Sequence, residues 1–203
     1  MKLYITDTSP YARIVRVVIL EKRLENRIAV IYALTRLADS PYYRINPSGR
    51  VPYLVRDDGV GLEESTLICA YLDGLDGNPI FGAPEGADEW EARRLEALAR
   101  SLLDGLAVWS REIHRLQPER SSTVIKHEAS RAARMVDLWE NDIAHTLSRS
   151  ALNMAQITLA CALGLEAQIP EFRWRPNHRR LSNWFDRIST RQSFVSTAPV
   201  MRR

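Results

Sequence analysis

The sequence predicts an α/β N-terminal domain followed by an all-α C-terminal domain. Over the first 77 residues, short runs of β-forming residues alternate with amphipathic helical patterns. Residues 78–86 then form a segment rich in Gly and Pro, which is typical of a linker. Beyond this linker, apolar residues recur every three or four positions, which is the period of a helix. We therefore divide the chain into domains at residues 1–77 and 87–203.

The first domain begins with a strand–helix–strand unit. Residues 2–6 are rich in β-formers and predict a strand. Ser9 and Pro10 then supply a hydroxyl cap and a proline at the first position of a helix. Residues 28–33 predict the second strand. Such a unit pairs its strands in parallel through a right-handed crossover.

The remaining elements of this domain are a helical turn, a hairpin and a helix. Residues 41–46 allow one helical turn. Residues 51–55 and 60–62 predict two strands joined by an Asp-Asp-Gly turn. A helix follows from Glu64, so the expected order is β-α-β-α-β-β-α.

The second domain is predicted to be entirely helical. Two long apolar stripes, at 95–113 and 125–147, are separated by a break at Pro118. They predict two amphipathic helices in an antiparallel hairpin. Residues 153–165 and 178–189 predict two further helices.

Composition and cysteine usage exclude several classes of protein. The 203 residues are 45% hydrophobic and 26% charged, an ordinary globular balance. No apolar run approaches the ~20 residues of a membrane span, and the N-terminus does not resemble a signal peptide. Cys69 and Cys161 lie far apart, and no Cys/His cluster has zinc spacing. We expect a cytoplasmic protein without a metal or a membrane segment.

The net charge of +3 is unevenly distributed. Residues 173–203 carry eight Lys or Arg side chains against one Asp. A basic end of this kind could bind a nucleic acid or another polyanion. No RNA-binding motif accompanies the charge, which favours a solvated helix face instead. We therefore predict no nucleic-acid partner.

The first segment with chemical potential is Ser9-Pro10-Tyr11-Ala12-Arg13. A hydroxyl at a helix N-terminus lies beside free N–H groups and the positive end of the helix dipole, which together stabilise an anion such as a thiolate. The alternative is that Ser9 only caps the helix. The segment resembles the thioredoxin-like superfamily, whose glutaredoxin members carry Cys-Pro-x-Cys here. Because this chain has Ser9 and Ala12 instead of two cysteines, dithiol exchange through the motif is excluded.

The second segment is Asn-Pro-Ser-Gly-Arg-Val-Pro-Tyr-Leu at residues 46–54. A cis bond between Val51 and Pro52 would turn the Val51 backbone outward, ready to pair with an extended peptide. The alternative is an ordinary proline on an edge strand.

The third segment is Glu63-Glu64-Ser65-Thr66-Leu67-Ile68, which opens a helix and contains the pair Glu64-Ser65. A serine with free helix N-terminal N–H groups suits a carboxylate, and an adjacent Glu suits an ammonium group. Together they fit the two charged ends of an amino acid. The alternative is a plain cap with an acidic first turn.

These three segments, followed by a linker and an all-α half, resemble the glutathione S-transferase family. The resemblance covers essentially the whole chain and points to a bacterial, YibF-like subgroup with the Ser-Pro-x-x-Arg start. It implies a thioredoxin-like N-terminal domain, an all-helical C-terminal domain, a homodimer, and glutathione as cosubstrate.

The resemblance also implies roles for individual residues. Ser9, as the catalytic residue, would donate a hydrogen bond to the glutathione sulfur. Val51 would pair through its backbone with the cysteinyl part of the tripeptide, with Pro52 cis. Glu64 and Ser65 would hold the γ-glutamyl end.

Further residues are candidates for the remaining parts of the site. Arg50 occupies a position near the glycine carboxylate in the family, and Arg36 is a weaker candidate for the same group. Tyr11, Trp109 and Arg111 are candidates for a second-substrate site. Trp109 lies on the apolar stripe and is also explained as a core residue, and Arg111 as part of a solvated helix face.

The implied function is transfer of the glutathione thiolate to small electrophiles, as in detoxification, with peroxidase activity as a variant. The alternative is a non-catalytic binding protein with the same fold that acts through protein partners. Such a protein would keep the fold while losing the glutathione contacts, whereas all three segments are present here.

Overall fold

The computed structural model describes residues 1–82, 89–143 and 151–199. The chain divides into two compact units. One comprises Met1–Ile80 together with the chain from Gln192 onward, and the other comprises Phe81–Arg191. This division differs from the sequence-based boundaries at the C-terminus, because the last helix packs on the first unit.

The first unit contains a four-stranded mixed sheet in the order β2-β1-β3-β4. Strands β1 (Lys2–Ile5) and β2 (Ala29–Tyr32) pair in parallel, which confirms the predicted strand–helix–strand unit. Strand β3 (Tyr53–Val55) pairs antiparallel with β1 and with β4 (Gly61–Leu62). The α/β expectation for this half of the chain is therefore confirmed.

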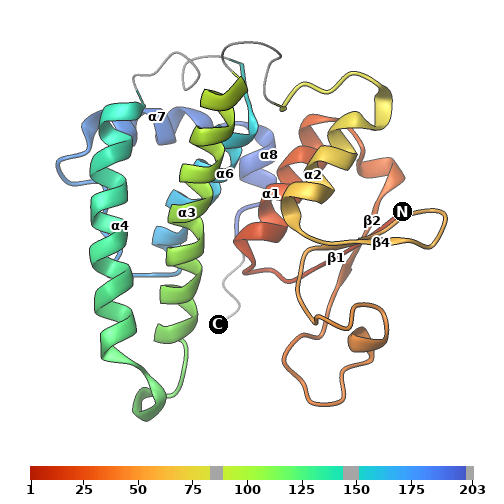
Figure 1. Ribbon diagram of the computed structural model, residues 1–203, viewed down its shortest axis with the longest axis horizontal. Coiled ribbons are helices and arrows are strands. Elements are labelled where there is room, and N and C mark those ends of the chain that lie inside the picture. Colours follow the sequence, from red (N-terminus) through yellow and green to blue (C-terminus); the bar gives the residue numbers. More distant parts are fainter. Residues whose placement is uncertain (83–88, 144–150, 200–203) are drawn as a thin grey trace. The chain divides into compact units, whose positions relative to one another are not determined.

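The principal helices of this unit are α1 (Pro10–Glu21) and α2 (Ser65–Asp73), which pack side by side (Figure 1). Leu3 of β1 is paired with Leu54 of β3, and both side chains are fully buried. Short 3₁₀ turns occupy Glu25–Arg27, Pro41–Arg44 and Gly74–Asp76.

A short helix that the sequence analysis did not predict, α8 (Gln192–Ser196), also belongs to this unit. The Arg13 guanidinium donates to the Phe194 carbonyl at 3.3 Å and lies 5.9 Å from the centre of the Phe194 ring. The Ser193 hydroxyl donates to the Glu21 carboxylate at 2.5 Å. Arg13, the last residue of the Ser-Pro-Tyr-Ala-Arg segment, thus holds α8 on α1.

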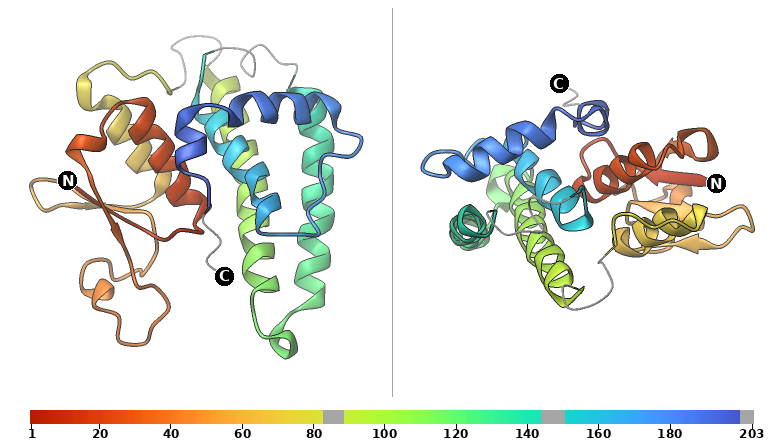
Figure 2. Two further views of the ribbon diagram at one scale, coloured as in Figure 1. Left: turned by 180° about the vertical axis from the view of Figure 1, so that it is seen from behind. Right: turned by 90° about the horizontal axis from the view of Figure 1, so that it is seen from above.

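The second unit is helical, as predicted. The α-helices among its described residues are α3 (Glu89–Ile113), α4 (Ser122–Asp142), α6 (Met154–Leu163) and α7 (Arg179–Ser189). Helices α3 and α4 lie side by side, and α6 packs against α3 with every residue buried (Figure 2).

The break between the two long helices and the end of the second helix can be compared with the predictions. Pro118 lies in a 3₁₀ turn between α3 and α4, where it was predicted to break the helix. The predicted second stripe ran to Leu147, which lies outside the described residues. No helix within the described ranges has the length and apolar character that crossing a bilayer requires.

Candidate functional site

The three segments singled out in the sequence meet at one edge of the sheet. Tyr4, near the end of β1, is paired with Tyr53, the first residue of β3. Leu62, at the end of β4, is paired with Leu54. Because β3 runs antiparallel to both neighbours, the end of β1, the start of β3 and the end of β4 share that edge. The starts of α1 and α2 follow β1 and β4 there.

Ser9 is the N-cap of α1, with Pro10 as the first helical residue. Its hydroxyl oxygen accepts a hydrogen bond from the Ala12 N–H at 3.2 Å, so the predicted cap is confirmed. The hydroxyl hydrogen has no acceptor among the described residues. Since a hydroxyl can accept and donate at once, Ser9 remains able to donate to an anion placed at the helix start.

The Val51–Pro52 peptide bond is cis. Pro52 is buried and Val51 is partly exposed. Within the part of the chain that the structure describes, neither the Val51 N–H nor its carbonyl makes a hydrogen bond. This backbone can pair with an extended peptide.

The peptide groups on both sides of Arg50 are held firmly. The Arg50 carbonyl accepts hydrogen bonds from the Tyr42 hydroxyl and from Asn46 Nδ2, the latter at 3.0 Å. The Arg50 N–H donates to the Ser48 hydroxyl at 3.2 Å. Burial raises the pKa of Tyr42 to about 12, so its hydroxyl keeps its proton. The Arg50 side chain is exposed and forms no ion pair within the described ranges.

The turn before Arg50 requires glycine at position 49. Gly49 has φ +66°, a conformation that L side chains rarely adopt. A Cβ atom there would also lie 2.7 Å from the Tyr43 ring. The Tyr43 ring packed against Gly49 sets the path of the turn into Arg50.

Glu63 is the first residue of the third segment, and the sequence alone assigned it no role. Its Oε2 accepts hydrogen bonds from Ser48 Oγ at 2.6 Å and from Asn46 Nδ2 at 2.9 Å. The Ser48 and Asn46 hydrogen bonds hold the pKa of Glu63 below its ordinary value of 4.5, and the charge of Arg50 adds to this effect. Its partners lie 15 and 17 residues away in the sequence, so no local pattern could reveal them.

Glu64 and Ser65 form the start of α2. Glu64 is the N-cap residue and is exposed. Ser65 is fully buried, so its side chain meets a ligand only after neighbouring groups move aside. The exposed group at this helix start is therefore the Glu64 carboxylate, which accepts a hydrogen bond from the Thr66 hydroxyl at 3.3 Å.

Two further candidate site residues of the first unit are Tyr11, at the start of α1, and Arg36, in the loop after β2. Tyr11 is a first-turn residue of α1 and is partly exposed. Arg36 is exposed, and its backbone N–H donates to the Tyr43 hydroxyl at 3.0 Å.

The other second-substrate candidates, Trp109 and Arg111, lie on α3 in the helical unit. Trp109 is 4% exposed and packs edge-on against Phe172, with ring centres 6.1 Å apart. Arg111 is exposed, and its Nε donates to the Ala107 carbonyl at 3.1 Å. Trp109 thus lies in the core of its unit, whereas the Arg111 side chain faces solvent.

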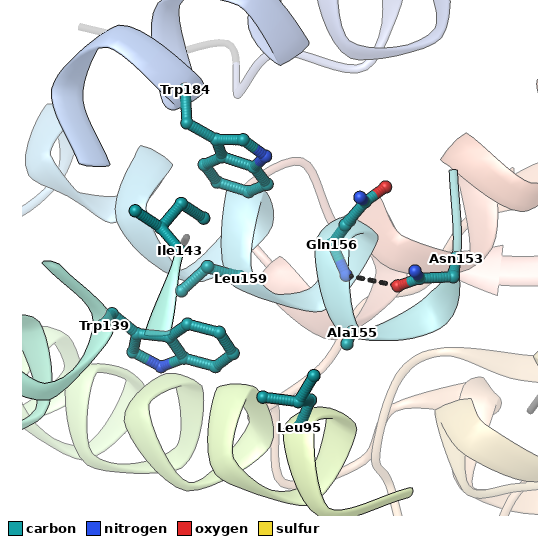
Figure 3. A pocket seen from close by; sticks show the side chains of 8 residues that line it. All are labelled: Leu95, Trp139, Ile143, Asn153, Ala155, Gln156, Leu159 and Trp184. Atoms are coloured by element: carbon teal, nitrogen blue, oxygen red, sulfur yellow. Dashed lines mark hydrogen bonds between the residues drawn. The ribbon is translucent and has the colours of Figure 1, made fainter. Parts of the chain in front are cut away.

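The helical unit also contains a small cavity of about 10 Å³ (Figure 3). It is lined mainly by apolar side chains, among them Trp139, Leu159 and Trp184. This volume holds about one water molecule. A cavity of this size cannot take a small-molecule substrate.

The structure also bears on metal ligation and on the basic segment at residues 173–203. No group of three or more His, Cys, Asp or Glu residues in the described ranges could hold a metal ion. In the basic segment, Arg175 forms ion pairs with Glu166 and Asp186, both at 2.8 Å. That arginine therefore serves the fold.

The edge of the sheet offers a defined set of chemical groups. It combines two helix N-termini, an unpaired backbone at Val51, a free cation at Arg50 and an exposed carboxylate at Glu64. Such a set suits an extended, zwitterionic peptide that carries an anionic group near Ser9. These features define a thioredoxin-like domain attached to a helical unit.

Comparison with known proteins agrees with this class. Residues 8–75 match the family model of the glutathione S-transferase N-terminal domain. The uncharacterized GST-like protein YibF of Escherichia coli K12 is 28% identical over 201 residues, which are 98% of each chain.

Solved structures are similar over the whole chain. A glutathione transferase family member from Pseudomonas fluorescens Pf-5, with bound S-(propanoic acid)-glutathione, is 31% identical, with a TM-score of 0.86 over 99% of this chain and 100% of that one. A glutathione S-transferase from Methylobacillus flagellatus KT with bound glutathione is 30% identical, with a TM-score of 0.86 over 98% and 99%. The chain belongs to the glutathione S-transferase family.

Proposed function

We propose that this protein is a glutathione transferase that conjugates the glutathione thiolate to small electrophiles, acting as a homodimer in the cytoplasm. The convergence of the Ser9, Val51 and Glu64 segments at one edge of the sheet carries this proposal. Relatives with bound glutathione support it. Cys69 and Cys161 are buried and are not joined in a disulfide, which suits a reducing compartment.

Glutathione would lie extended along this edge. Its γ-glutamyl ammonium pairs with Glu64, and its γ-glutamyl carboxylate meets the start of α2, where Ser65 joins after local rearrangement. Its cysteinyl backbone pairs with Val51 beside cis-Pro52. Its glycine carboxylate meets the Arg50 guanidinium, a charge-assisted contact.

The cysteinyl sulfur then lies at the start of α1, beside the Ser9 hydroxyl. A free thiol has a pKa near 8.5, and each unit of lowering reflects about 1.36 kcal/mol of thiolate stabilisation. The Ser9 hydrogen bond and the α1 N-terminus supply this stabilisation. The thiol proton leaves to solvent, and the thiolate forms a carbon–sulfur bond as a leaving group such as halide departs.

The first test is binding of glutathione and its dependence on Glu64. Wild-type protein should bind to glutathione-agarose and elute with free glutathione. Glu64→Ala leaves the ammonium group unpaired, and a charge-assisted hydrogen bond contributes roughly 1.5–3 kcal/mol. Because Glu64 is exposed, we expect the lower end of that range, which is at least a several-fold weaker affinity by titration calorimetry.

Two results would count against this assignment. Failure of the wild-type protein to bind glutathione would reject the proposed function. Unchanged affinity in Glu64→Ala would reject only the role of Glu64. Activity is measured separately, as formation of the conjugate from a haloarene and glutathione.

A further inference from the structure

We propose that Glu63 is a positioning residue that holds the loop at residues 46–50 so that Arg50 and Val51 are correctly placed for glutathione. This inference rests on the proposed function. It assigns no ligand contact to Glu63 itself. The carboxylate acts through Asn46 and Ser48.

Glu63 is linked by hydrogen bonds to the carbonyl and to the N–H of Arg50, in each case through one intervening side chain. Asn46 Nδ2 donates to Glu63 Oε2 at 2.9 Å and to the Arg50 carbonyl at 3.0 Å. Ser48 Oγ donates to Glu63 Oε2 at 2.6 Å and accepts from the Arg50 N–H at 3.2 Å. One carboxylate oxygen therefore orients Asn46 and Ser48, two of the three side chains that bond the Arg50 backbone, the third being Tyr42.

Glu63 also connects two parts of the proposed site because of its position in the chain. Glu63 is bonded directly to Glu64, which begins α2. The carboxylate therefore ties the segment proposed for the γ-glutamyl end to the loop proposed for the glycine end. An extended tripeptide bridges these two regions, so their separation must match its length.

The charge of Glu63 also matters for Arg50. A carboxylate paired closely with the Arg50 guanidinium would compete with the glycine carboxylate of a ligand. Among the described residues, Glu63 and Arg50 form no ion pair, and the Glu63 hydrogen bonds go to Asn46 and Ser48 instead. Asn46 is 2% exposed, which keeps this linkage partly shielded from water.

The decisive experiment compares two ligands in Glu63→Gln. The amide keeps the shape of the side chain, so the fold is retained, but the charged acceptor is lost. We expect glutathione affinity, measured by titration calorimetry, to fall about three- to tenfold. The expected loss is modest because Glu63 is exposed to solvent. Affinity for γ-glutamylcysteine, which lacks the glycine carboxylate, should fall less.

Two further measurements separate positioning from general stability. Hydrogen bonds lower the pKa of Glu63, so its charged form dominates near neutral pH and is lost as pH falls through that pKa. The ratio of wild-type to Glu63→Gln affinity should therefore approach one in acid, and the ligand's own titration cancels in this ratio. In a Ser48→Ala background, Glu63→Gln should cost less affinity than it does in the wild-type protein, because only the Asn46 link remains to be lost.

Glu25→Gln is the matched control, because it also removes one exposed carboxylate. Glu25 lies in the 3₁₀ turn Glu25–Arg27, outside the three segments. It should leave both affinities unchanged. Equal glutathione affinity in Glu63→Gln and wild type, or an equal loss for both ligands, would overturn the positioning role while leaving the proposed function intact. Wild-type protein that binds no glutathione would overturn both.

Discussion

At the scale of single residues, Ser9 combines a structural contact with a proposed chemical role. Ser9→Ala removes the donor to the glutathione sulfur but keeps the α1 N–H groups and the Val51 backbone. We therefore expect the pKa of the bound thiol to rise, and the conjugation rate to fall more than glutathione affinity. The thiolate absorbance of bound glutathione, titrated against pH, measures this pKa. An unchanged midpoint would mean that the helix terminus alone activates the thiol.

Ser9→Ala also removes a helix cap, which costs about 1 kcal/mol of stability. Ser121 provides the matched control, since it caps α4 through an equivalent hydrogen bond to the Val124 N–H at 3.3 Å. Ser121→Ala should lower stability similarly without moving the thiol pKa. A pKa shift in that variant would assign the effect to general destabilisation.

Residue-scale prediction from sequence succeeded where the cause is local. The Ser9 cap follows from a hydroxyl residue placed directly before a proline. Burial of Ser65 could not be foreseen, because it depends on what packs over the start of α2. Glu63 could not be assigned because its partners become neighbours only when β3 and β4 pair.

At the scale of elements, Phe194 is the buried apolar side chain of α8, the helix that packs on α1. Phe194 is 2% exposed, so Phe194→Ala should destabilise the first unit by about 3 kcal/mol. Urea unfolding would measure this loss, and hydrogen exchange would show whether α8 is released first. Val195, 56% exposed on the same helix, is the control. Val195→Ala should change stability by no more than about 0.5 kcal/mol, and equal effects of the two variants would contradict this account.

Helices and strands with a strong periodic pattern in the sequence were predicted, and a helix without one was not. The long stripes of α3 and α4 and the β-forming runs of β1 and β2 were visible in the sequence. The five residues of α8 are too short to display a period. Their helix depends on contacts with Arg13 and Glu21, more than 170 residues away.

At the scale of the whole molecule, the proposed assembly is a homodimer. Family resemblance implies it, and closed two-fold symmetry is the commonest arrangement of identical chains. Light scattering at micromolar concentration should give twice the mass of one chain. Calorimetry should give one glutathione per chain. The mass of a single chain would reject the dimer but not glutathione binding.

The return of the chain to the first unit has a consequence for biosynthesis. The ribosome completes residues 1–80 well before it reaches Gln192, because the whole helical unit is translated in between. At ordinary elongation rates this interval lasts about 5 to 20 seconds. During that time the nascent sheet and α1 lack their last helix, so the face of α1 that receives Phe194 stays uncovered. Final closure of the N-terminal unit therefore has to wait until the helical unit has been synthesised.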